Sequence, residues 1–149
     1  MPYGEELRVE TIVVTAALIE CEGRYLVTRR QPGVHLEGYW EFPGGKCGRA
    51  ESLSECLERE LREELAVDAR VGLEVFTTTH AYAERRVELH FFQCELAGRP
   101  SPQLGQEMRW VPTSELTALV FPPADSELIH RLTGTTAHRD QPALNRPAP

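Results

Sequence analysis

Short segments of clustered or alternating hydrophobic residues follow one another along the chain, and most of them are typical of strands. Residues 9–20 are rich in Val, Ile, Thr and Ala, which predicts a buried strand. Turn-forming residues at 21–24 lead into a second strand at 25–30, and we expect these two strands to pair as a hairpin. Further strands are predicted around Trp40 and at residues 70–81, 86–96 and 108–111.

Residues 52–66 have instead the periodicity of an amphipathic helix. Its apolar stripe consists of Leu53, Leu57, Leu61 and Leu65. On a helical wheel Glu64 falls about 20° from Leu57, inside this stripe, whereas Glu60 lies close to the edge at about 60° from Leu57 and Glu63 lies further round at about 120°. An unpaired ionised carboxylate under a core face costs several kcal/mol. We therefore expect Glu64 to be paired, protonated or bound to a metal.

A glycine pair lies between the Trp40 strand and this helix. The extended run that starts at Trp40 breaks at Pro43, Gly44 and Gly45, which predicts a strand, a turn and a helix in succession. Glycines let the backbone approach a ligand closely and expose amide and carbonyl groups to a metal or a phosphate. The turn and the acidic helix together indicate a site for a divalent cation and phosphate.

The C-terminal part of the chain has weaker signals. Residues 97–106 are rich in Gly and Pro and predict a loop, and short helices are predicted at 114–119 and 125–132. Residues 133–149 have no apolar period, so we expect a flexible tail there. We find no internal repeat and predict a single domain over residues 1–132.

Composition narrows the possible functions. The chain has 149 residues, of which 41% are hydrophobic, and a net charge of −7. This charge argues against a nucleic-acid-coating protein, which would present basic stripes. We find no apolar window of membrane-spanning length and no secretory pattern near the start, so we expect a cytoplasmic protein without nucleic-acid or membrane partners. The four cysteines, Cys21, Cys47, Cys56 and Cys94, form no Cys-x-x-Cys pair, which favours reduced thiols over disulfides or a zinc site.

Gly45, Glu51 and the run from Arg59 through Glu60, Glu63 and Glu64 to Val67 resemble the Nudix box of the Nudix hydrolases. Ala66 stands where that family usually has Gly, so the helix is expected to end differently or to run on by a residue. The similarity extends over residues 9–132 and is closest to MutT-type enzymes, through residues 28–30, 40–46 and 121–125. It implies an α/β fold (α+β, with a mixed sheet) in an α/β/α sandwich, and Mg²⁺-dependent hydrolysis of a nucleoside triphosphate to a monophosphate and pyrophosphate.

The same resemblance implies roles for individual residues. Glu60, Glu63 and Glu64, with the Gly44 carbonyl, would bind Mg²⁺ or, in its place, Mn²⁺, which prefer oxygen ligands. Glu60 is also the candidate general base, and Glu107 is an alternative base or a further ligand. We expect Arg59 to orient Glu60 or Glu63 rather than to form a plain surface ion pair. Glu51 either favours the helix dipole or completes the metal shell, and both interpretations stay open.

Residues around the substrate follow from the same comparison. Arg30, Gly45 and Lys46 are the candidate phosphate contacts, whereas Arg29 should face the other way along its strand. Phe42, Arg85 and Phe121 are expected near the base. His80 and His90 are expected to be packing or hydrogen-bonded histidines.

Asp125 replaces an Asn that MutT uses to read the base. An ionised carboxylate only accepts hydrogen bonds, so it favours a base with an amino donor, such as cytosine or 5-methylcytosine. A protonated Asp125 would instead mimic the amide and suit 8-oxoguanine. The alternative is a plain N-cap of the last helix.

Three functions stay open at this point. The favoured one is nucleotide-pool sanitisation, with 8-oxo-dGTP or dCTP-like substrates. The second is a Nudix hydrolase for ADP-ribose, a dinucleoside polyphosphate or capped RNA. The third is a noncatalytic nucleotide-binding Nudix domain, which predicts the loss of a box carboxylate, although all of them are present. The sequence does not indicate the oligomeric state.

Overall fold

The computed structural model describes residues 9–134, so the predicted tail lies, from residue 135 onward, outside the described part. The strands are β1 Glu10–Leu18, β2 Glu20–Cys21, β3 Arg24–Arg29, β4 Trp40–Glu41, β5 Gly44–Lys46, β6 Ala69–Ala81, β7 Arg85–Leu96 and β8 Met108–Pro112. The helices are α2 Leu53–Leu65 and α3 Ser126–Thr133, with 3₁₀ helices η1 Thr113–Ala118 and η2 Pro123–Asp125. The mixed α+β class is therefore confirmed. None of the described helices is long and apolar enough to cross a membrane.

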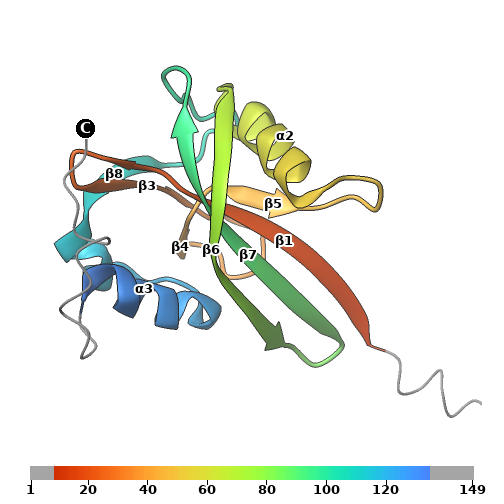
Figure 1. Ribbon diagram of the computed structural model, residues 1–149. Helices are drawn as coiled ribbons and strands as arrows, with labels where there is room; N and C mark the ends of the chain where they lie inside the picture. Colours follow the sequence, from red (N-terminus) through yellow and green to blue (C-terminus); the bar gives the residue numbers. More distant parts are fainter. Residues whose placement is uncertain (1–8, 135–149) are drawn as a thin grey trace, which may run out of the picture.

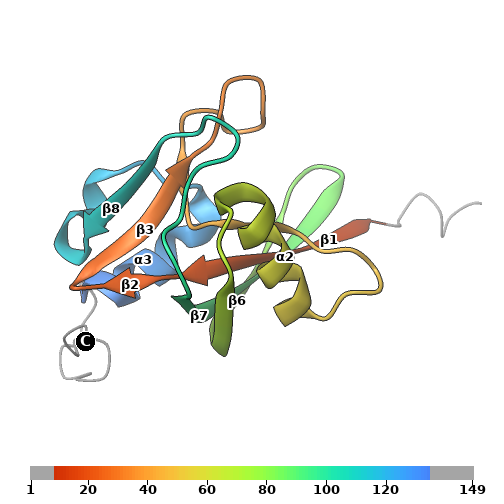
Figure 2. The ribbon, with the colours of Figure 1, turned by 90° about the horizontal axis from the view of Figure 1, so that it is seen from above.

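The strands form two sheets, of which one is mixed as expected. One sheet has the order β5-β1-β7-β6, with β1 parallel to β7 and the other neighbours antiparallel. In the other, β3 pairs with β2, β4 and β8, and Figure 2 shows β3 and β8 to one side of the long strand β1. The predicted hairpin between residues 9–20 and 25–30 is wrong for most of its length, because β1 pairs with β5 and β7 and only β2 pairs with β3.

Strand β1 is central because it contributes side chains to two hydrophobic layers. Ala16 and Leu18 pack in one core with Leu128 and Ile129 of α3. Ala17, together with Ile19 just after the strand, packs in the other core against leucines of α2. Successive side chains of a strand point to opposite faces, so one strand can serve both layers. Figure 1 accordingly shows α2 and α3 on opposite sides of β1 and β7.

Helix α2 has well-defined ends. The Ser52 side chain accepts a hydrogen bond from the Glu55 N–H and the Glu55 carboxylate accepts one from the Ser52 N–H, which is a capping box. Ala66 adopts the left-handed conformation (φ 53°, ψ 41°) and donates its N–H to the Arg62 carbonyl. The expectation that alanine would change the helix end is wrong, because Ala66 takes the conformation that glycine usually occupies.

A disulfide joins Cys47, just after β5, to Cys56 in α2. The prediction of reduced thiols is wrong for this pair, since strand β5 brings their Cα atoms to 5.3 Å although they are 9 residues apart. Cys21 is free and exposed, and Cys94 is free and buried, in agreement with that prediction.

Candidate active site

A cavity of about 710 Å³ opens beside β1, the glycine turn and the hairpin of β6 and β7. Its polar lining includes Arg30, Glu41, Lys46, Glu64, Arg85 and Asp125. Apolar side chains, among them Phe42, Leu89 and Phe91, form much of the remaining wall. A mostly apolar cleft of this size with a few converging charged groups suits a small polar ligand such as a nucleotide.

Arg59 connects the acidic residues of the Nudix-box segment. Its guanidinium donates to both carboxylate oxygens of Glu51, and further N–H groups donate to Glu60 and to Glu63 at 3.1 Å each. It also donates to the Lys46 carbonyl at 3.1 Å. One side chain thus fixes the acidic helix against the glycine turn through charge-assisted hydrogen bonds.

Glu51 is held by hydrogen bonds just before α2, and its two proposed roles stay predictions. Its carboxylate accepts from Arg59 and from the Gly48 N–H at 2.9 Å. The hydrogen bonds from Arg59, and next the one from Gly48, lower the pKa of Glu51 to about 2. The structure therefore supports Glu51 as the anchor of Arg59.

Glu60 and Glu64 carry carboxyl groups that are costly to ionise together. Burial raises the pKa of both, and for Glu64 burial and the neighbouring Glu60 and Glu41 raise it to about 8. The two carboxyl groups are hydrogen-bonded to each other. Glu64 is thus paired with Glu60 and ionises less readily than an ordinary glutamate, which agrees with the expectation drawn from the helical wheel.

The glycine turn leaves room for these acids. A Cβ on Gly45 would overlap the Glu60 carboxylate, and a Cβ on Gly44 would overlap the Thr15 carbonyl oxygen. Gly44 therefore requires the absence of a side chain, whereas a side chain at position 45 would displace the Glu60 carboxylate. The consequence is that the backbone of the turn lies directly against Glu60 on one side and β1 on the other.

The predicted metal ligands fit a cation in chemistry but are not assembled as a complete set. Within residues 9–134 no three His, Cys, Asp or Glu side chains are arranged to hold a metal ion. The Glu63 carboxylate is turned toward Arg59 and is 60% exposed. Glu60 and Glu64 do fit, because buried oxygens that repel one another are stabilised by a hard divalent cation. Glu63 would have to turn from Arg59 to join them.

The candidate phosphate and base residues mostly line the cavity. Arg30 donates to Glu41 at 2.8 Å and to the His35 carbonyl at 2.6 Å, while Lys46 and Arg85 also reach the wall. Phe42 lines the cavity. Phe121 does not line it but stacks on the Phe42 ring, at 5.3 Å between ring centroids.

Asp125 is 4% exposed and lines the same cavity. Burial, followed by the nearby Glu41 charge, raises the pKa of its carboxyl to about 7. Asp125 occupies the N-cap position of α3, as the alternative interpretation has it, but its side chain makes no capping hydrogen bond. A buried acid that is not used by the helix is available to a ligand.

Comparisons with known proteins decide the family. The family described as NUDIX domain matches residues 14–131. This chain belongs to the Nudix family. The 8-oxo-dGTP diphosphatase of Haemophilus influenzae is 36% identical to it over 128 residues, covering 84% of this chain and 93% of that protein. The CTP pyrophosphohydrolase of Escherichia coli is 33% identical over 132 residues, covering 88% and 98%.

Solved structures agree with this assignment. The solution structure of the E. coli ORF135 protein has a TM-score of 0.78 at 32% identity and covers 95% of this chain and 99% of that one. A MutT protein from Methanosarcina mazei Go1 has a TM-score of 0.75 at 25% identity, covering 84% and 94%. The resemblance to the Nudix box and the expected fold class are confirmed, and the chain is a Nudix hydrolase.

Glu107 does not line the Nudix cavity. It pairs with Arg29 at 3.1 Å and Arg109 at 3.7 Å, and both guanidiniums lie over the Trp40 ring. Arg29 thus faces away from Arg30, as expected. The role of Glu107 as a base or metal ligand stays a prediction, and this ion-pair cluster is what the structure shows for it.

The sequence did not single out two aromatic residues around the cavity of the Nudix domain, His35 and Tyr82. His35 meets Tyr82 edge-on at 5.6 Å, and His80 lies 4.6 Å from the same ring. His35, His80 and Tyr82 all line the cavity. In the sequence, the signal for this role was the presence of aromatic residues in a loop and at the end of a hairpin. His80 therefore packs as expected.

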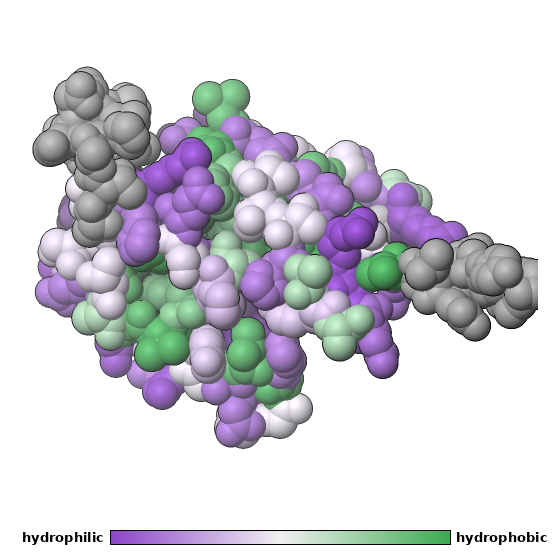
Figure 3. All heavy atoms as spheres, turned by 90° about the horizontal axis from the view of Figure 1, so that it is seen from below, coloured by the Kyte–Doolittle hydropathy of each residue, from purple (hydrophilic) through white to green (hydrophobic). Residues whose placement is uncertain are grey.

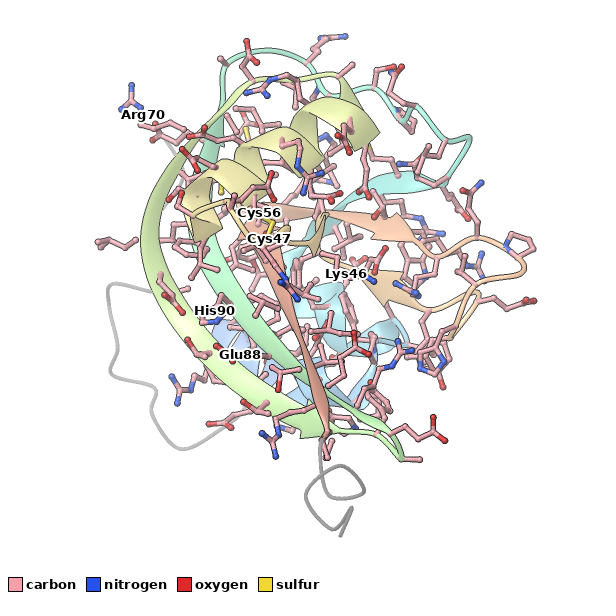
Figure 4. All side chains as sticks on the ribbon, turned by 90° about the vertical axis from the view of Figure 1, so that its right-hand side faces the viewer. Lys46, Cys47, Cys56, Arg70, Glu88 and His90 are labelled. Atoms are coloured by element: carbon pink, nitrogen blue, oxygen red, sulfur yellow. A yellow bond between two sulfur atoms is a disulfide. The ribbon has the colours of Figure 1, made fainter. Side chains whose placement is uncertain are left out.

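His90 lies on the other face of β7, since its neighbours Leu89 and Phe91 line the cavity. It is hydrogen-bonded between Glu74 at 2.6 Å and Glu88 at 2.8 Å, which confirms that it is a hydrogen-bonded histidine. Figure 4 shows His90 and Glu88 together on this strand.

Proposed function

We propose that this Nudix hydrolase cleaves (deoxy)nucleoside triphosphates to a monophosphate and pyrophosphate, and that it removes damaged or excess nucleotides, with 8-oxo-dGTP and dCTP-like compounds as leading substrates. One observation carries the proposal. A single cavity of about 710 Å³ is lined both by Glu64, Gly45 and Lys46 and by the buried Asp125. The names of the relatives above support the same substrate class.

The carboxylates of Glu60, Glu63 and Glu64, with the Gly44 carbonyl, would hold Mg²⁺, and Mn²⁺ could replace it. When bound, such an ion neutralises polyphosphate charge and lowers the pKa of a bound water. Arg59 donates hydrogen bonds to the Glu60 and Glu63 carboxylates. Lys46 and Arg30, which line the cavity, would contact the phosphates.

The general base is better placed at Glu60 than at Glu107. The Glu60 carboxylate lies against the glycine turn with its side chain 12% exposed, and burial raises its pKa, which strengthens it as a base. Glu107 is half exposed and already paired with two arginines.

Asp125 suits both leading substrates, one when its carboxyl is protonated and the other when it is ionised. With a pKa of about 7, its carboxyl is protonated in a large fraction of molecules at neutral pH. The protonated form donates and accepts like an amide and suits 8-oxoguanine, whereas the ionised form only accepts and suits an amino group. Phe42, buried beside it in the cavity, offers an apolar ring to the base.

The decisive experiment measures pyrophosphate release from a panel of normal and damaged triphosphates with Mg²⁺. We expect turnover of at least one of them, and Glu63→Gln should lower kcat strongly because it removes a ligand charge. Glu58→Gln is the matched control, since it changes the same side chain at another position of α2. Absence of turnover across the panel, or a fully active Glu63→Gln variant, would reject the proposal.

A second experiment addresses the base. Asp125→Asn supplies an amide at every pH, so we expect it to raise the preference for 8-oxo-dGTP over dCTP. The ratio of the two kcat/KM values is the measurement. An unchanged ratio would remove Asp125 from base recognition while leaving the hydrolase assignment intact.

A further inference from the structure

The disulfide between Cys47 and Cys56 links the two parts of the site that carry the proposed metal ligands. Cys47 directly follows β5, which contains Gly44, Gly45 and Lys46, and Cys56 lies one turn before Glu60 in α2. Figure 4 shows the bond beside α2 and next to Lys46. No residue of this pair takes part in the chemistry proposed above.

The two sulfur atoms differ in their exposure. Cys56 is fully buried, with its Sγ 3.3 Å from the Thr15 hydroxyl and 3.8 Å from the Gly45 carbonyl oxygen. Cys47 is only partly buried. Since thiol–disulfide exchange depends on access, a reductant in solution reaches Cys47 and not Cys56.

The loop that the disulfide closes also contains the anchor of Arg59. Glu51 lies within residues 47–56 and binds the Arg59 guanidinium through both oxygens. The Lys46 carbonyl, adjacent to Cys47, accepts from the same guanidinium. Arg59 in turn holds Glu60 and Glu63. A change in the freedom of this loop therefore reaches the acidic residues through one side chain.

We propose that Cys47 and Cys56 form a reversible redox pair that controls this hydrolase by tethering or releasing the loop at residues 47–52. The reductant is a dithiol. Its thiolate attacks Cys47 Sγ, the S–S bond breaks, and Cys56 leaves as a thiolate that takes a proton. The second thiol of the reductant then displaces Cys47 and becomes oxidised, so that two electrons and two protons pass to the protein.

Reduction changes the contacts at the turn. A disulfide sulfur carries no hydrogen, whereas the Cys56 thiol formed on reduction can donate to the Gly45 carbonyl 3.8 Å away. Gly45 is the residue that lies against the Glu60 carboxylate. The released loop holds Glu51, and thus Arg59, less firmly. We expect the oxidised form to be the more active one, because its carboxylates are held in place.

The test compares oxidised and dithiothreitol-reduced protein, with the thiol state followed by alkylation and mass spectrometry. We expect two additional alkylated cysteines, a fall in kcat/KM of about threefold or more, as loss of positioning produces, and faster hydrogen exchange of amides at residues 47–52. Equal activity and equal exchange in the two states would overturn the proposal, as would a pair that never forms a disulfide in air.

Variants separate this pair from the remaining cysteines. Cys47→Ser, at the partly exposed position, should have the kcat/KM and the hydrogen exchange of the reduced wild type, and dithiothreitol should change neither. Cys21→Ser removes an exposed free thiol and should keep the full response. A Cys47→Ser protein that still responds would assign the effect elsewhere and reject the pair. Hydrogen exchange needs no substrate, so failure of the redox pair remains distinguishable from failure of the proposed hydrolysis.

Discussion

Arg59 is the residue on which the arrangement of the carboxylates depends most. It bonds to three glutamates and to the Lys46 carbonyl, and nearby carboxylates raise its pKa further above its ordinary value. It is therefore cationic under all conditions of interest, and its charge compensates acids that would otherwise repel one another. This guanidinium links Glu51, Glu60 and Glu63 to one another.

Replacement of Arg59 should damage catalysis more than folding. We expect Arg59→Ala to lower kcat/KM about a hundredfold, because Glu60 and Glu63 lose their orientation. Pyrophosphate release and thermal unfolding measure the two effects. Arg62→Ala is the control, since Arg62 pairs with the exposed Asp68 at 3.2 Å and should change the rate less than about twofold. Equal effects of the two variants would contradict the orienting role.

Asp125 makes the stability of the protein depend on pH. Its pKa rises from 3.8 in the unfolded chain to about 7 in the native state. Between these values the unfolded chain has released a proton that the native protein still binds, so the free energy of unfolding falls as pH rises, and the loss is complete above about pH 7.

Chemical unfolding of Asp125→Asn at a series of pH values, without metal, tests this dependence. Relative to wild type, the variant should gain stability from pH 4 to 7, by at most about 4 kcal/mol for a shift of this size. Asp68→Asn makes the same chemical change at an exposed position. A constant difference between Asp125→Asn and wild type across the range would show that the native carboxyl ionises normally.

At the scale of elements, α2 was predictable because its signals are local. The leucine stripe, Ser52 and Glu55 lie within a few turns of one another, and the helix begins and ends within one residue of the prediction. The position of Glu64 in the stripe also followed from periodicity alone. Partners of Arg59 outside the helix did not follow, because Glu51 and Lys46 reach it through the fold of the turn.

The C-terminal end of α2 offers a separate test of backbone strain. Ala66 holds a left-handed conformation that costs a residue with a Cβ about 1 kcal/mol. Ala66→Gly should therefore raise the free energy of unfolding by about 0.5 to 1 kcal/mol, measured by urea denaturation. Ala69→Gly, in strand β6 with ordinary backbone angles, should lower it. A destabilised Ala66→Gly would mean that α2 ends differently in solution.

The molecule as a whole is where sequence reasoning was least complete. The parallel pairing of β1 with β7 joins residues far apart in the chain, and no local pattern distinguishes it from a hairpin with β3. On the face shown in Figure 3, hydrophobic residues lie among hydrophilic ones. The Cys47–Cys56 bond escaped prediction for the same reason, since it requires β5 to lie beside α2.

That bond should also contribute to the stability of the whole domain. It closes a short loop, between residues 9 positions apart, and a cross-link of this kind removes conformations from the unfolded chain. We expect reduction to lower the free energy of unfolding by about 2 to 3 kcal/mol. Urea denaturation in chelator, with and without dithiothreitol, measures this difference.

The unfolding experiment separates the two consequences of the cross-link. The entropic effect acts on the unfolded chain, so it should appear in wild type and Cys21→Ser and be absent from Cys47→Ser, whatever the nucleotide or metal present. Superimposable unfolding curves for oxidised and reduced wild type would show that reduction gives the native loop as much conformational freedom as it gives the unfolded chain. Redox control of activity would then rest on the contacts among Cys56, Gly45 and Glu60 rather than on stability.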